Sequence, residues 1–354
     1  MKNGCTLVEL ATELTRQLET KRDLLVPSPM LHFSTDDGGS SLVVIDQVQG
    51  PRTYGITELA RRQLAEKLKI PYAYFERMRA EQPALLDRNV NTWLTANPER
   101  RLVRTLDGHV RAVLSDKYRR LDNFDLAEHV LPILQRLEDA RFASVELTDT
   151  KLYLKIVTPR VQREVAPGDF VQAGVVVTNS EVGEGTLSVS PLVYRLICRN
   201  GAIAADRSMK KTHVGRSLEA DDTHVLTFKD DTLRADDTAF FLKVRDVVEE
   251  AVSEASLTTI SEKMQRTMGI RLQGDPVKSV EVLADRFYLN EVERNGVLRH
   301  LIEGGDLSGY GLINAVTGFS QDVESYDRAT ELEVFGGRLI EMPDQDWEAV
   351  AKAQ

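Results

Sequence analysis

The chain has 354 residues, of which 42% are hydrophobic and 28% charged, and its formal net charge is −10. This length predicts two domains, or one large domain with a helical extension, and the composition excludes collagen-like, low-complexity and wholly disordered chains. Apolar runs stay well below the roughly 18 residues of a membrane span, and two cysteines are too few for a disulfide framework, so we expect a cytoplasmic protein with no membrane partner.

The first 98 residues predict a mainly helical region with one short strand. Thr6 and Glu9 have the spacing of a capping box before a helix at 7–22, and a strand is expected at 42–45. Helices are expected at 57–68 and from residue 72 to about 78. Because they flank a tight break, this pair is similar to a helix-turn-helix that reads DNA, and a helical pair packed on the core is the alternative.

Residues 99–216 predict an antiparallel sheet with one inserted helix. The Asp107-Gly108 dipeptide is a strong turn signal between strands at 102–106 and 109–114. A helix follows to about residue 137. Strands are then expected at 144–147, 151–157, 170–178, 186–189 and 193–198, with connections too short for parallel crossovers.

Residues 217–354 predict an acidic, mostly helical region. Asp275-Pro276 is typical of a helix start, and Asn290 with Glu293 has the spacing of a second capping box. The whole chain is therefore expected to be of the α+β class, with a central antiparallel sheet and its inserted helix, N-terminal helices and a mostly helical C-terminal third.

Positive charge is concentrated in two stretches despite the acidic total. Residues 51–120 carry 15 Lys plus Arg against 8 Asp plus Glu, and residues 195–216 carry 6 against 1. Cations that follow phosphates and aromatic rings that stack on bases are what a single-strand groove needs. The alternative is that these arginines pair with the surplus carboxylates. The candidate nucleic-acid-binding residues are Arg104, Arg111, Lys117, Tyr118, Arg119, Arg120, Arg195, Arg199, Lys210, Lys211, His213 and Arg216.

Arg195 lies in a largely apolar strand and should have a charged partner, because unpaired burial of a cation is costly. Glu181, in the Gly-rich turn at 179–183, is the expected partner in a structural pair. His213 could donate to a phosphate or act as a general base, and a hydrogen-bonded structural histidine is the alternative.

Motifs for cofactor or metal chemistry are missing from the sequence. It contains no phosphate-binding Gly-x-x-x-x-Gly-Lys-Ser/Thr loop, no His-Glu-x-x-His, no Cys-x-x-Cys and no Gly-x-Ser-x-Gly. We therefore expect no cofactor and no metal, and a binding protein rather than an enzyme.

Several stretches resemble one known family. RTLDGHVRAVLSDKYRRLDN (104–123), VVVTNSEVGEGTLSV (175–189), PLVYRLICRNG (191–201), KKTHVGR (210–216) and YGLINAVTGF (310–319) are similar to the phage/plasmid-like proteins catalogued as domain of unknown function 932. The resemblance implies a mobile-genetic-element context and hence DNA metabolism, and it brings no catalytic residues with it.

The leading interpretation is a non-enzymatic protein that binds single-stranded DNA, as an accessory in recombination or annealing and as a possible homo-oligomer. One alternative is a protein-protein module, such as an inhibitor of host defence, whose acidic C-terminal helices contact a host protein. Another is a metal-dependent nuclease that uses Glu181 and His213. A sequence-specific regulator acting through the helical pair at 57–78 is the last.

Overall fold

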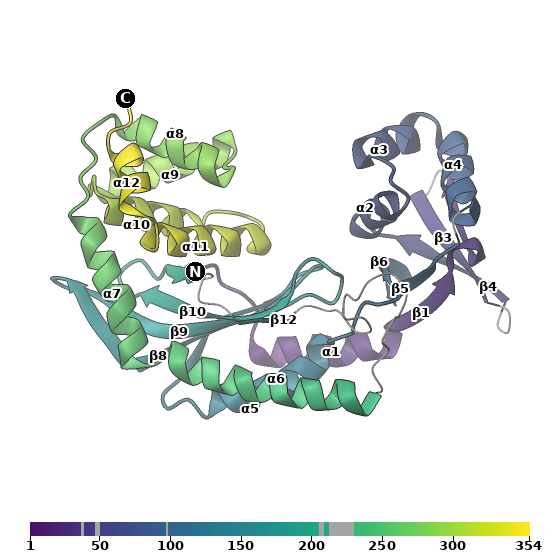
Figure 1. Ribbon diagram of the computed structural model, residues 1–354, viewed down its shortest axis with the longest axis horizontal. Helices are drawn as coiled ribbons and strands as arrows, with labels where there is room; N and C mark the ends of the chain where they lie inside the picture. Colours follow the sequence, from purple (N-terminus) through teal and green to yellow (C-terminus); the bar gives the residue numbers. More distant parts are fainter. Residues whose placement is uncertain (37–38, 47–49, 97, 205–208, 212–229) are drawn as a thin grey trace, which may run out of the picture.

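The computed structural model describes residues 1–36, 39–46, 50–96, 98–204, 209–211 and 230–354. The predicted α+β class is confirmed, with two sheets in place of one central sheet. Figure 1 shows one lobe around each sheet, and the C-terminal helices stand over one end of the second sheet. Within the described residues, no helix is both long and apolar enough to cross a bilayer.

The first sheet has the strand order β1-β5-β6-β4-β3-β2. Its strands are β1 (Arg22–Pro27), β2 (Leu31–Asp36), β3 (Gly39–Asp46), β4 (Gly50–Ile56), β5 (Arg100–Leu106) and β6 (His109–Ser115), with a 3-10 turn at Ser28–Met30. The predicted hairpin turn is confirmed: Asp107 and Gly108 both have positive φ angles, of 50° and 75°, the conformation that a two-residue turn of this type needs.

Three helices cover this sheet: α2 (Glu58–Lys67), α3 (Tyr72–Glu81) and α4 (Pro83–Ala96). The helical pair predicted at 57–78 is therefore present as α2 and α3. Lys69 between them has a φ of 57°, where a glycine is more usual. Phe75 and Met78 of α3 are buried against the sheet, so this pair packs on the core.

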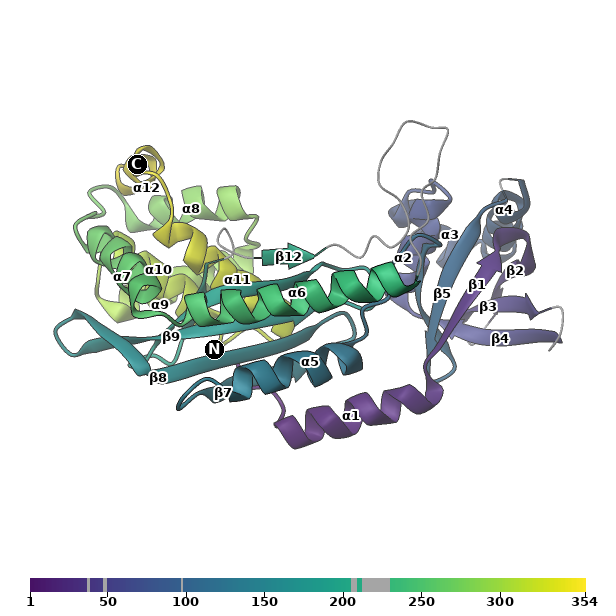
Figure 2. The same cartoon turned by 60° about the horizontal axis from the view of Figure 1, so that its bottom comes forward.

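The second sheet is antiparallel, in the order β11-β10-β9-β8-β7, and β12 pairs with β10. Its strands are β7 (Arg141–Leu147), β8 (Leu152–Ala166), β9 (Asp169–Asn179), β10 (Leu187–Arg195), β11 (Gly201–Ile203) and β12 (Met209–Lys211). One face is apolar and is covered by α1 (Leu7–Thr20), α5 (Asn123–Gln135) and α6 (Asp230–Ala251) (Figure 2). The opposite face is partly open, which makes it the place to look for a ligand site.

The C-terminal helices pack around one end of the second sheet. They are α7 (Glu254–Met268), α8 (Pro276–Phe287), α9 (Glu291–Gly304), α10 (Gly309–Phe319), α11 (Tyr326–Ile340) and α12 (Asp344–Ala351). Both predicted capping boxes are confirmed, at Thr6 with Glu9 and at Asn290 with Glu293. Buried side chains of these helices, among them Phe335 and Trp347, form the largest core cluster with β8, β9 and β10.

The predicted division at residue 98 does not coincide with a boundary between the sheets. Residues 22–56 form four strands instead of one, and β5 and β6 join these strands rather than the second sheet. Pro27 at the end of β1 is compatible with a strand because β1 is an edge strand, where a missing N–H costs no internal ladder bond.

The loop between β9 and β10 holds the two lobes together. Val182 at its centre is 1% exposed and packs against Ala112 and Leu114 of β6. Gln63 of α2 donates from Nε2 to the carbonyl of Val182 at 2.7 Å, and its Oε1 accepts from the backbone N–H of Val113 at 2.9 Å. We call this connection, residues 180–186, the docking loop. It fixes the first lobe beside the open face of the second sheet.

Candidate nucleic-acid interface

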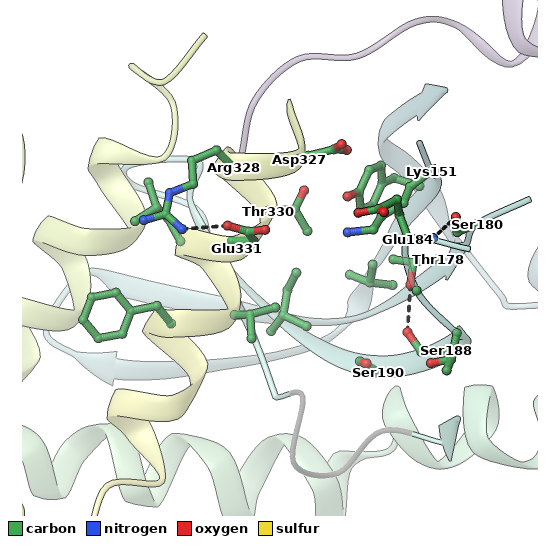
Figure 3. Close-up of a pocket in the computed structure, with 18 of the residues that line it drawn as sticks. Lys151, Thr178, Ser180, Glu184, Ser188, Ser190, Asp327, Arg328, Thr330 and Glu331 are labelled. Carbon is green, nitrogen blue, oxygen red and sulfur yellow. Dashed lines mark hydrogen bonds and ion pairs between the residues drawn. The ribbon is translucent and has the colours of Figure 1, made fainter. Parts of the chain in front are cut away.

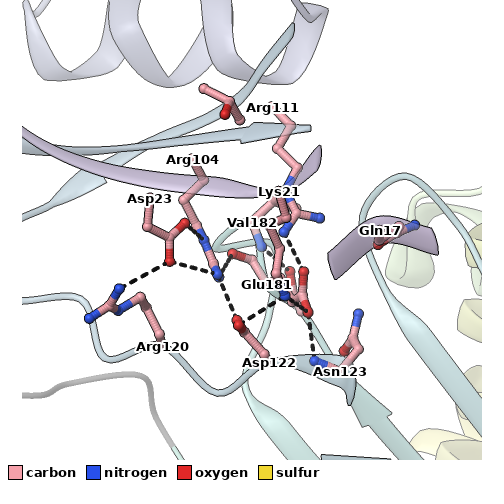
Figure 4. A network of polar contacts seen from close by, with 12 residues as sticks. Gln17, Lys21, Asp23, Arg104, Arg111, Arg120, Asp122, Asn123, Glu181 and Val182 are labelled. Carbon is pink, nitrogen blue, oxygen red and sulfur yellow. Dashed lines mark hydrogen bonds and ion pairs between the residues drawn. The ribbon is translucent and has the colours of Figure 1, made fainter. Parts of the chain in front are cut away.

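The first predicted cluster is largely buried at the junction of the lobes. Arg104 has no exposed side-chain surface; it donates to Asp23 at 2.8 and 3.1 Å, to Asp122 at 2.6 Å and to the carbonyl of Glu181 at 2.8 Å (Figure 4). Arg111 forms an ion pair with the carboxylate of Glu181. The prediction that these arginines contact a ligand is wrong for Arg104, because the docking loop covers that side of the hairpin.

The remaining members of this cluster do not form a common surface either. Tyr118 is mostly buried, and its hydroxyl donates to the carbonyl of Ser180 at 2.9 Å. Arg119 is paired with Asp236 at 3.1 Å. Lys117 and Arg120 are exposed, and Arg120 lies 3.4 Å from the Asp23 carboxylate. Most of the predicted positive charge is therefore neutralised by carboxylates, as in the alternative interpretation of these arginines.

The buried network also predicts sensitivity to acid. Burial of Asp122 opposes its ionisation, but the guanidinium of Arg104 and the ammonium of Lys21 outweigh it and lower the pKa of Asp122 to about 2. A carboxyl with a depressed folded-state pKa stabilises the fold above its unfolded pKa of about 3.9, and this contribution is lost as the pH falls towards 2. We expect urea unfolding to show this loss between pH 4 and 2, and Asp122→Asn to have a flatter profile there.

The predicted Arg195–Glu181 pair is wrong. Arg195 forms a two-point pair with Asp169, at 2.6 to 2.9 Å, and the Tyr310 hydroxyl donates to the same carboxylate at 2.7 Å. Arg195 ends β10, a strand of 9 residues that spans roughly 30 Å, whereas Glu181 lies in the loop that precedes the start of this strand. Glu181 instead accepts from Lys21 at 3.4 Å, from Arg111 and from the backbone N–H of Asn123 at 2.6 Å.

The second predicted cluster is only partly described. Arg199 is exposed, outside the sheet, with its carbonyl accepting from the N-terminal ammonium group. Lys210 of β12 is exposed and lies opposite Ser188 of β10. Lys211 ends β12; its side chain lies outside the described residues, as do His213 and Arg216 altogether. Lys210 is thus the one described member of the cluster that reaches the open face of the second sheet.

That face carries a groove of about 380 Å³, which we call the open-face groove (Figure 3). It lies between α11 and the docking loop. Hydroxyl groups of Thr178, Ser188 and Ser190 line its floor, and the first two are 2.8 Å apart. Ser188 and Ser190 alternate along β10 with Leu187 and Val189, which are buried against the helices of the other face.

Four cations line the open-face groove: Lys151, Lys210, Arg328 and Arg338. Arg328 is neutralised by Glu293, at 2.7 and 2.8 Å, and by Glu331 at 2.6 Å. Lys151, Lys210 and Arg338 form no ion pair with any residue that the structure describes. The groove therefore presents three ammonium or guanidinium groups that an anionic ligand can neutralise.

An exposed aromatic residue, Tyr288, lies in the chain between two residues that line the same groove. Tyr288 follows α8 with a φ of 53°, and 88% of its surface is exposed. Its neighbours Phe287 and Leu289 line the groove, and its carbonyl accepts from Arg328 at 3.3 Å. An exposed tyrosine ring provides a flat surface on which a nucleobase can stack.

The carboxylates of the groove are mostly engaged as well. Glu184 of the docking loop pairs with Arg62 of α2 at 2.9 Å, and Asp327 accepts hydrogen bonds from the hydroxyls of Thr148 and Thr150. In the described part of the chain, no three His, Cys, Asp or Glu side chains lie close enough to hold a metal ion. The nuclease alternative depends on the Glu181 carboxylate, which already accepts hydrogen bonds from three donors of the protein.

Sequence reasoning missed Lys151, Arg338, Tyr288 and the hydroxyl row. Only the hydroxyls carried a usable signal, the alternation of serine with apolar residues in β10. The chain matches no protein-family model, no curated protein and no solved structure. Its resemblance to the phage/plasmid-like family stays a prediction.

Proposed function

We propose that this protein binds a single strand of nucleic acid, DNA foremost, in the open-face groove and serves as a non-enzymatic accessory in recombination or annealing. The observation that carries the proposal is the combination, in one groove, of three cations without a described partner, Lys151, Lys210 and Arg338, with a row of hydroxyls. The exposed Tyr288 lies in the chain between two groove residues. The site differs from the one expected from the arginine clusters and shares only Lys210 with them.

Each of these groups suits one part of a nucleotide. Ammonium and guanidinium groups bind phosphate oxygens, serine and threonine hydroxyls donate to phosphates and sugars, and an aromatic ring stacks on a base. None of these contacts reads a sequence, so the proposal is for binding with little sequence preference. The net charge of −10 is compatible with it, because the carboxylates nearest the groove are already paired or hydrogen-bonded.

Filter binding to single-stranded DNA at several salt concentrations tests this proposal. We expect the triple variant Lys151→Ala, Lys210→Ala, Arg338→Ala to bind on the order of 10–100-fold more weakly at 0.1 M salt. The slope of log affinity against log salt should be shallower by about 2–3, because each lost phosphate contact releases one counterion fewer. Duplex DNA and single-stranded RNA serve as competitors that define the preferred polymer.

A matched control removes the same charge elsewhere. Lys117, Arg120 and Arg199 are exposed cations of the predicted clusters, and none of them lines the open-face groove. Their triple alanine variant should retain nearly all of the affinity. Equal losses in the two triple variants would contradict the groove as the site, and a wild-type chain that binds none of the three polymers would contradict the function and favour a protein partner.

A further inference from the structure

A second cavity lies next to the open-face groove, between the two lobes. Its volume is about 520 Å³, and it is lined by the start of α2, the turn of the β5–β6 hairpin and the β7–β8 turn. Lys151 lines both the cavity and the groove. The docking loop also borders both, with Glu181 and Val182 on the cavity and Ser180 and Glu184 on the groove. The two hollows are therefore neighbours along one loop.

Arg62 is a half-exposed cation of this cavity. Its side chain is 43% exposed, whereas the side chain of Arg111, also in the cavity, is 12% exposed and held by Glu181. The partner of Arg62 is Glu184, 2.9 Å away and 31% exposed, which lines the open-face groove. A carboxylate of one lobe thus forms an ion pair with a guanidinium of the other, at the point where the groove and the cavity adjoin.

We infer that the interlobe cavity continues the open-face groove and that Arg62 binds a phosphodiester group of the strand there. In the absence of a strand, Glu184 forms an ion pair with Arg62, and a phosphate of the strand replaces the Glu184 carboxylate. The inference rests on the proposed function and extends its site by one phosphate contact. An ion pair as exposed as Arg62–Glu184 contributes little free energy. A guanidinium binds two phosphate oxygens with charge-assisted hydrogen bonds, so the exchange is favourable once a strand lies in the groove.

Four variants test the inference by filter binding to single-stranded DNA: Glu184→Gln, Arg62→Ala, the two combined, and Glu303→Gln as a control. Glu303 is an exposed carboxylate of α9 that lines neither the cavity nor the groove and has no ion pair to a described residue. We expect Glu184→Gln to raise the affinity about threefold to tenfold and to steepen the salt slope by up to about 1. Arg62→Ala should bind a few-fold more weakly than the wild type.

The interaction between the substitutions distinguishes the proposed exchange from a general charge effect. If Glu184 acts by pairing with Arg62, its substitution should give no gain in affinity in the Arg62→Ala background, and Glu303→Gln should leave the affinity unchanged. An equal gain in both backgrounds, or the same gain from Glu303→Gln, would overturn the inference, while the proposed function stands on the loss in the groove triple variant. If neither the wild type nor Glu184→Gln binds DNA, both fall.

Discussion

Replacing Glu333 by alanine should lower the free energy of unfolding by about 3–5 kcal/mol, the range for breaking one partner out of a buried ion pair. Glu333 of α11 and Lys155 of β8 are both 0% exposed, and their Nζ and Oε2 atoms are 2.6 Å apart. Lys155 also donates to the hydroxyl of Thr330 at 2.9 Å and lies 4.6 Å from the ring centroid of Tyr326. Without Glu333, the Lys155 ammonium would be left in an apolar layer without a counter-charge.

The double variant Lys155→Met, Glu333→Leu separates the charge from the packing. Because it removes both ions and keeps similar volumes, it should recover most of the lost stability in urea unfolding. If it is as unstable as Glu333→Ala, then loss of shape, and not an unpaired charge, is the cause. Since this pair fastens α11, one wall of the open-face groove, to the sheet, Glu333→Ala should also weaken strand binding.

Local features of the fold follow from the sequence because they depend on neighbouring residues. The Asp107-Gly108 turn needs positive φ angles at two adjacent positions, and the capping box at Thr6 is complete within four residues. The choice of partner strands is not local. β5 and β6 alternate as expected, but whether they join β1 or β7 depends on contacts across most of the chain.

The same distinction explains the errors at the candidate site. Arg104 has one carboxylate partner, Asp122, 18 residues away in the sequence and another, Asp23, 81 residues away. It contacts no ligand because the docking loop, 77 residues away, lies against it. The count of charges over residues 51–120 includes the arginines but not these partners, which lie outside that window. Conversely, Lys151 and Arg338 lie far apart in the sequence and outside the basic clusters. They line the same groove only because α11 packs on the second sheet. Isolated lysines and arginines are common on surfaces, so nothing in the sequence marked them.

Replacing Arg104 by alanine should also cost about 3–5 kcal/mol of unfolding free energy. The substitution leaves the carboxylates of Asp23 and Asp122, which are 12% and 21% exposed, facing a void without their shared counter-ion, and it leaves the carbonyl of Glu181 without its donor. Arg104→Lys should recover only part of this loss. A single ammonium cannot reproduce the fork that binds two carboxylates and a carbonyl at once.

The control for Arg104 is Arg120, which forms an ion pair with one of the same carboxylates, that of Asp23. Arg120 is 59% exposed and 3.4 Å from Asp23, so Arg120→Ala should change the stability by less than about 1 kcal/mol. Because the network joins α1, β1, β5 and the docking loop, Arg104→Ala should loosen the lobes relative to each other as well as destabilise them. Protease sensitivity at the docking loop should therefore rise for Arg104→Ala and not for Arg120→Ala. A stability loss of similar size in the two variants would mean that burial of the guanidinium does not determine its contribution.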